Sequence, residues 1–167
     1  MKEKITIFWG RSKSTILSLL ITFIIASAVT TFWFRLVVVN GDSMNPTLEN
    51  GDIGISFIVH ENTKINRNDI VAIKVNTDDN KEKFIIKRVI GLPGEHMVSD
   101  GENITIDGQP IQQDYLAEGT YTDPFDIQLG DDEYYVLGDN RENSRDSREY
   151  GIFHHEDFLT HGAVMLP

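Results

Sequence analysis

The sequence predicts a mainly β domain with a small cap subdomain, preceded by one transmembrane α-helix. An uncharged apolar run covers residues 14–34, and short β-branched runs separated by turn residues follow it. A polar, poorly periodic stretch interrupts those runs. With 167 residues, the chain has room for one domain of ordinary size and an appended segment.

The first element is the run STILSLLITFIIASAVTTFWF, from Ser14 to Phe34, which contains no charged residue. As a helix it is long enough to cross a hydrocarbon core of about 30 Å. Basic residues precede the run, and aromatic residues followed by Arg35 close it. This pattern predicts a cytoplasmic segment over 1–13, a transmembrane helix over 14–34 and an extracytoplasmic domain over 35–167.

A cleaved signal peptide is the alternative interpretation of the same segment. The basic start, the apolar stretch and the small residues 26–28 match the tripartite pattern of a secretory signal, and cleavage there would release a soluble protein beginning near Val29. The retained anchor is preferred because the apolar run continues to Phe34 and reaches transmembrane length. A buried core helix fits the basic and aromatic flanks less well. Self-cleavage near Ala28 stays open.

The outer domain contains short apolar runs of strand length. They cover 36–40, 53–59, 70–75, 84–90, 104–106 and 134–137. The Asp107-Gly108 pair separates ITI from QPI and predicts a hairpin turn. The polar stretch 114–132 is either a long surface loop or part of a small cap formed by 100–132.

Composition excludes several classes of function. The absence of cysteine removes disulfides, thiolate metal sites and thiol nucleophiles. The net charge is -11, and because residues 1–35 hold five Lys and Arg against one Glu, the outer domain carries -15. Such acidity argues against a nucleic-acid partner. A metal hydrolase is disfavoured because the five histidines show no HExxH-like spacing.

The first candidate segment is GDSMNPTL at 41–48, directly after a predicted strand. A serine in such a turn most often satisfies local backbone groups. The functional interpretation is that the turn presents the Ser43 hydroxyl as a nucleophile, with the Ser43 backbone N–H facing a developing oxyanion.

The second candidate is Lys87, which lies inside the apolar strand pattern of 84–90. Strand alternation places Lys87 on the face of Ile85 and Val89, and Arg88 on the opposite face. A lysine in this position either extends its ammonium to water or loses its proton, because burial disfavours the charged form. Only the neutral amine can act as general base toward a serine hydroxyl.

The third candidate is GDNRENSRDSR at 138–148, dense in Asp, Asn, Arg and Ser. It is either a solvated loop or a buried polar support for a site, in which a hydroxyl orients the base and an Asp/Arg pair fixes the loop.

Together these segments resemble bacterial type I signal peptidase, the membrane-bound leader peptidase. The resemblance covers nearly the whole chain: the anchor, GDSMNPTL, NGD at 50–52, KRVIGLPGE at 87–95 and GDNRENSRDSR occur in the family's order. It implies a Ser43/Lys87 dyad on a β-rich core without a metal or cofactor. It also implies that Ser144 hydrogen-bonds the lysine amine, and that Asp146 and Arg148 form a supporting ion pair.

One position departs from part of the family. Where some members carry a hydroxyl residue two before the nucleophile, this sequence has Gly41. The Ser43 N–H is then the oxyanion donor that can be named, and a contribution from the Gly41 backbone stays open. The chain is also short between Glu95 and Gly138, as expected for a compact form with a reduced second subdomain.

The implied substrates are signal sequences of exported preproteins with small residues such as Ala at the first and third positions before the scissile bond. Membrane lipid and the secretion translocon are the other expected partners. Apolar residues flanking the dyad are interpreted equally as walls of shallow substrate pockets or as ordinary core. These residues are Val37, Val39, Met44, Leu48 and Ile86.

Two rival functions fit the sequence less well. A self-cleaving repressor-type Ser/Lys peptidase is disfavoured by the membrane span, the acidic outer domain and the lack of a helix-turn-helix segment. A non-catalytic assembly factor on the same fold is disfavoured because both dyad residues are present. The sequence does not separate a housekeeping enzyme from one devoted to a few substrates, such as pilus subunits.

Overall fold

A computed structural model describes residues 2–76 and 82–166, with side chains described from residue 14 onward. The chain divides into two compact units, Met1–Arg35 and Leu36–Pro167.

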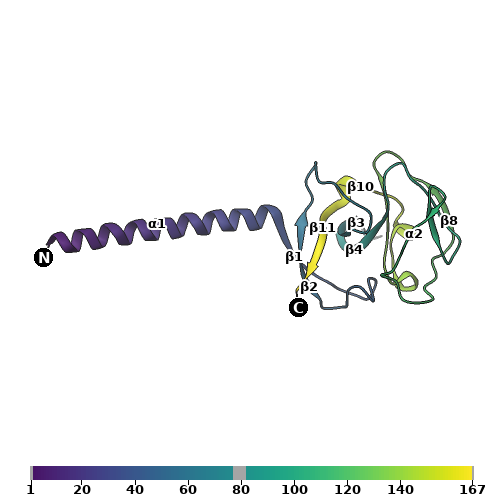
Figure 1. Ribbon diagram of the computed structural model, residues 1–167, viewed down its shortest axis with the longest axis horizontal. Helices are drawn as coiled ribbons and strands as arrows, with labels where there is room; N and C mark the ends of the chain where they lie inside the picture. The colour runs from purple at the N-terminus through teal and green to yellow at the C-terminus, as the bar shows by residue number, and fades with distance from the viewer. Residues whose placement is uncertain (1, 77–81, 167) are drawn as a thin grey trace. The chain divides into compact units, whose positions relative to one another are not determined.

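The first unit is the helix α1, Lys2–Trp33, which Figure 1 shows as one continuous coil. Its segment Ser14–Trp33 has a mean hydropathy of 2.1 and is long enough to cross a membrane. None of that segment is buried, so nothing in the structure supports the core-helix alternative. The helix ends one residue before the predicted boundary because Phe34 begins the first strand.

The second unit is built on two antiparallel sheets, which confirms the mainly β fold (Figure 1). The larger sheet has the order β1-β2-β11-β3-β4-β9-β10. Its strands are β1 Phe34–Val38, β2 Ile53–Ile58, β3 Ile70–Asn76, β4 Glu82–Gly91, β9 Glu133–Leu137, β10 Phe153–His154 and β11 Phe158–Met165. Three short helices accompany it: η1 Arg141–Asn143, α2 Ser147–Tyr150 and η2 His155–Asp157.

The smaller sheet has the order β7-β6-β5-β8, and we refer to this sheet with its loops as the cap. Its strands are β5 His96–Ser99, β6 Ile104–Ile106, β7 Gln109–Pro110 and β8 Phe125–Gln128. The predicted hairpin at Asp107-Gly108 is confirmed, since β6 and β7 pair in antiparallel register across it. Between the hairpin and β8, the polar stretch has no regular element, as expected for a long loop.

Strand β4 connects the two cores and thereby positions the lysine. Ile85 and Val89 lie in the core of the larger sheet, whereas Ile90 lies in the core of the cap. Period-2 alternation therefore sends successive side chains of β4 to different environments. Lys87 pairs with the fully buried Val71 of β3, so its stem starts inside the sheet rather than at an edge.

Candidate active site

Ser43 lies in the turn that follows β1. The side chains of Met44 and Leu48 are buried and anchor this turn. The Leu48 N–H donates to the Met44 carbonyl at 3.0 Å. The Asn140 backbone N–H donates to the Ser43 carbonyl at 3.1 Å, and its side-chain amide donates to the Asp42 carbonyl at 3.0 Å. The segment after β9 thus clamps the turn that carries Ser43.

Lys87 reaches this turn from β4. Its Nζ lies 2.6 Å from Ser43 Oγ and donates to the Ile86 carbonyl at 2.7 Å. The lysine is only 3% exposed. The structure therefore brings together the two residues that the sequence predicted as a dyad, although 44 positions separate them.

The electrostatic environment favours the neutral amine. Burial lowers the pKa of Lys87 from 10.5 to about 8, the carboxylates of Asp146 and Asp139 act in the raising direction, and the charge of Lys83 acts in the lowering direction. Burial is the largest of these effects. A substantial fraction of Lys87 is then unprotonated at mildly alkaline pH, as a general base requires.

The Ser43 backbone N–H donates no hydrogen bond to any described residue, so it is available to a developing oxyanion. The Gly41 N–H is not available. It donates to Asn50 Oδ1 at 2.8 Å, because the turn folds the Asn50 side chain back onto it. The interpretation of Gly41 as a second oxyanion donor is therefore wrong for this structure.

The predicted hydrogen bond between Ser144 and Lys87 is absent from the described residues. Ser144 Oγ is buried and has no hydrogen-bond partner there, whereas Lys87 Nζ is directed to Ser43 and Ile86. Ser144 packs against Gly138, where a Cβ would meet its Oγ at 2.1 Å. The serine is thus placed beside the nucleophile turn by packing and not by a bond to the base.

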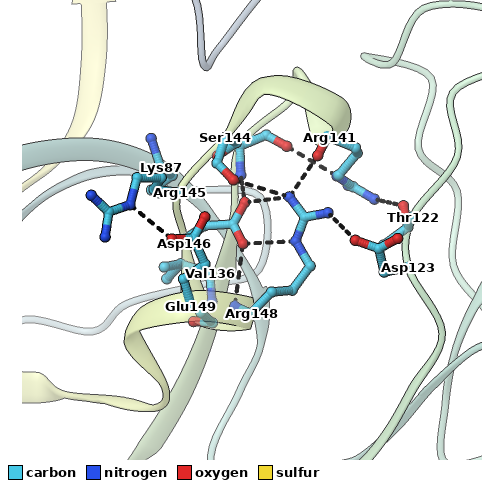
Figure 2. Close-up of polar contacts among 12 residues, drawn as sticks. Lys87, Thr122, Asp123, Val136, Arg141, Ser144, Arg145, Asp146, Arg148 and Glu149 are labelled. Atoms are coloured by element: carbon cyan, nitrogen blue, oxygen red, sulfur yellow. Dashed lines mark hydrogen bonds and ion pairs between the residues drawn. The ribbon is translucent and has the colours of Figure 1, made fainter.

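Asp146 and Arg148 make the ion pair that the sequence led us to expect (Figure 2). Arg148 Nε donates to Asp146 Oδ1 and Nη2 donates to Oδ2, each at 2.9 Å. Asp146 is fully buried and also accepts the Gly138 N–H at 2.9 Å. Arg148 Nη2 also donates to the Arg141 carbonyl at 2.7 Å, which ties together the two ends of the segment 141–148. This geometry fixes the backbone that packs against Ser43.

The sequence did not reveal a second buried pair next to the site. Arg88 donates to both carboxylate oxygens of Asp139, at 2.9 and 2.6 Å, and Thr47 Oγ1 donates to the same carboxylate at 2.5 Å. The guanidinium also lies 3.9 Å from the centre of the Tyr115 ring in the cap. Strand alternation predicted which face of β4 Arg88 occupies. It did not predict that its partner would be Asp139 in the third candidate segment.

The five proposed substrate-contacting residues divide into two groups. Val39, Met44 and Leu48 are 1–4% exposed and form one buried cluster, which favours the core interpretation for them. Val37 and Ile86 are half-buried and remain candidates for contact with substrate. Within the described part of the chain, no three His, Asp or Glu side chains come together to hold a metal ion.

Comparison with known proteins agrees with the geometry. The family model for signal peptidase, peptidase S26, matches residues 12–166. Signal peptidase I P of Bacillus subtilis subsp. natto is 33% identical over 165 residues, covering 89% of this chain and 88% of the relative. Signal peptidase I S of Bacillus subtilis strain 168 is also 33% identical, covering 91% and 84%.

A solved structure shows the same fold. The crystal structure of a signal peptidase I from Enterococcus faecalis V583 is 30% identical with a TM-score of 0.51, and the match covers 63% of this chain and 98% of that chain. The expected family is therefore confirmed: the chain belongs to the signal peptidases of the peptidase S26 family.

Proposed function

We propose that this signal peptidase removes signal peptides from exported preproteins, with Ser43 as nucleophile and Lys87 as general base. The observation that carries the proposal is the 2.6 Å distance between Lys87 Nζ and Ser43 Oγ, on a lysine that is 3% exposed. Burial without a carboxylate partner at Nζ is what lowers the pKa of this lysine to about 8.

Acylation follows from this geometry. The neutral amine of Lys87 accepts the hydroxyl proton as Ser43 Oγ bonds to the carbonyl carbon at the end of the signal peptide. The Ser43 N–H donates to the oxyanion that forms. When the C–N bond breaks, the Lys87 ammonium returns the proton to the departing amine, which becomes the new amino terminus of the mature chain.

Deacylation uses the same base. Lys87 accepts a proton from water as the water oxygen bonds to the ester carbon, and Ser43 Oγ recovers that proton as the ester C–O bond breaks. In this proposal Asp146, Arg148 and Ser144 are positioning residues, because they act on the loop that packs against Ser43 and not on the reacting atoms.

The family resemblance supports small residues, such as Ala, at the first and third positions before the scissile bond. We place Val37 and Ile86 beside them, since these are the half-buried members of the predicted set. The apolar segment 14–34 serves as a single-pass membrane anchor, with 1–13 cytoplasmic and 35–167 extracytoplasmic. Membrane lipid and the secretion translocon stay predicted partners.

The experiment uses the full-length protein in mild detergent and a preprotein with an Ala-x-Ala site. Wild type is compared with Ser43→Ala, Lys87→Ala and Lys87→Arg, and the new amino terminus is located by mass spectrometry. We expect cleavage directly after the site by wild type alone, because a guanidinium stays protonated and cannot act as the base. Near-normal turnover by a folded Ser43 or Lys87 variant would rule out the dyad. No cleavage by folded wild type would favour a dedicated-substrate enzyme or an assembly factor.

A further inference from the structure

A polar cavity of about 310 Å³ adjoins the turn that carries Ser43. Three segments line it: Asn45 with Pro46, the cap loop 117–120, and 139–142 after β9. Its volume is at the lower end of the range for sites that bind small ligands or single side chains. The mechanism derived above uses none of the space in this cavity.

The cavity is close enough to Ser43 to receive a substrate that spans the dyad. Asn45 is two residues beyond Ser43, so their Cα atoms are no more than about 7 Å apart. An extended substrate advances about 3.3 Å per residue, and about two residues therefore cover this distance. Asn140, which also lines the cavity, holds the Ser43 carbonyl through its N–H.

The cavity is lined by other residues than those proposed to contact the signal peptide. Val37 and Ile86 do not line it; it is formed by residues that follow Ser43 in the chain, together with the cap loop. An extended substrate bound across the dyad leaves it in two directions. If the signal peptide runs past Val37 and Ile86, the cavity, which neither of them lines, is available to the other part, which begins with the leaving amine.

Two charged residues that line the cavity, Arg141 and Asp139, already form hydrogen bonds within the protein. Arg141 donates to Gly138, Thr122 and Gln113, while the Asp139 carboxylate accepts from Arg88 and Thr47.

The other polar groups relevant here are a hydrogen-bond acceptor and two carboxylates. Asn45 Oδ1 is buried and accepts no hydrogen bond from any described residue. Exposed Glu118 and Glu142 both line the cavity, and neither forms an ion pair within 14–76 or 82–166. Two uncompensated carboxylates favour a cationic ligand and disfavour an anionic one.

We propose that this cavity binds the first two or three residues of the mature chain, and that Glu118 and Glu142 make it favour a basic over an acidic side chain there. The inference rests on the proposed function, because it assigns the leaving-amine side of the same reaction.

The test is a competition between preproteins that share one Ala-x-Ala site and differ only at the second and third mature positions. Each position carries Lys, Ala or Glu in turn, and kcat/KM ratios are measured at low salt with the full-length protein in detergent. Wild type is compared with Glu118→Gln/Glu142→Gln. The control, Glu61→Gln/Glu156→Gln, removes the same charge from exposed positions outside the cavity.

We expect wild type and the control to cleave the Lys substrate about five- to tenfold faster than the Glu substrate at one or both positions. In the cavity variant the ratio should fall to near one, with the Ala substrate unaffected. The proposal is overturned if wild type shows no preference at either position, if the cavity variant keeps the preference, or if the control loses it equally. Failure of wild type to cleave any of the substrates would instead contradict the proposed function.

Discussion

Gly138 packs so closely against Ser43 that a Cβ on the glycine would meet the Ser43 carbonyl oxygen at 2.4 Å. The same Cβ would meet Ser144 Oγ at 2.1 Å. The Gly138 N–H is meanwhile held by buried Asp146, so the glycine backbone cannot easily withdraw. The absence of a side chain at 138 is thus a condition for the position of Ser43.

Gly138→Ala should therefore displace the turn that carries Ser43. We expect kcat/KM for preprotein cleavage to fall at least about tenfold, because a displacement of about 1 Å at a reacting group has large effects on rate. Gly130→Ala is the matched control, since its added Cβ meets only the side chain of Glu133, at 3.2 Å. Equal activities of the two folded variants would contradict this account.

The pH dependence of cleavage should follow the proton on Lys87. Only the neutral amine is active, so kcat/KM should rise with pH and level off above an apparent pKa of about 8. At pH 7 about a tenth of the enzyme is then in the active form. The measurement is kcat/KM from pH 6 to 10 with a substrate that does not titrate in this range. A limb centred near the ordinary lysine pKa of 10.5 would show that burial does not act as described.

The charge of Lys83 should affect the pH at which kcat/KM rises. Its ammonium disfavours a second positive charge on Lys87, so Lys83→Gln should raise the pKa of Lys87 and move the rising limb to higher pH. The shift should shrink as salt is added, because Lys83 is exposed. Lys64→Gln, also at an exposed position, is the control and should leave the limb in place. A limb that is unmoved by Lys83→Gln would exclude this contribution.

The sequence predicted the elements whose patterns are regular and local. Strands β3 and β4 have clear β-branched or apolar patterns, and the Asp107-Gly108 turn has a strong hairpin signal. Strand β11 was missed because Gly162, at φ 64°, and a register shift between His161 and Val164 break its period-2 pattern. Strand β8 was missed because its four residues lie in a polar stretch.

Only the site residues that belong to recognisable sequence motifs could be predicted. Ser43 and Lys87 were matched through segments whose order and spacing are specific, and their 2.6 Å contact agrees with that assignment. The Arg88–Asp139 pair joins positions 51 apart, and no local pattern specifies such a partner. The open question of the Gly41 N–H and the expected bond of Ser144 could not be decided from the sequence, because the hydrogen bond of Asn50 and the packing of Gly138 depend on the folded turn.

Ser144→Ala should not destabilise the protein. Its buried Oγ has no partner among the described residues, so removing the hydroxyl should leave the free energy of unfolding unchanged or raise it by up to about 1 kcal/mol. Ser56→Ala is the matched control: this 1% exposed serine donates to the His161 carbonyl at 2.9 Å, and its loss should cost about 1 kcal/mol. Urea unfolding of both variants makes the comparison. A larger loss for Ser144→Ala would reveal a partner that this structure lacks, and a loss of kcat without a loss of stability would indicate a contact made only during turnover.

Removing one member of the Arg88–Asp139 pair should be far more damaging than removing both. The side chains are 8% and 0% exposed, so Asp139→Ala leaves a buried guanidinium without its carboxylate and should cost about 3–5 kcal/mol of unfolding free energy. Arg88→Met/Asp139→Leu should recover much of that loss, because no buried charge remains. Glu82→Ala, which removes the exposed partner of Lys74, is the control and should change stability by less than about 1 kcal/mol. Additive losses in urea unfolding of the single and double variants would mean that Arg88 and Asp139 are not energetically coupled, and that this pair does not join β4 to the loop that clamps Ser43.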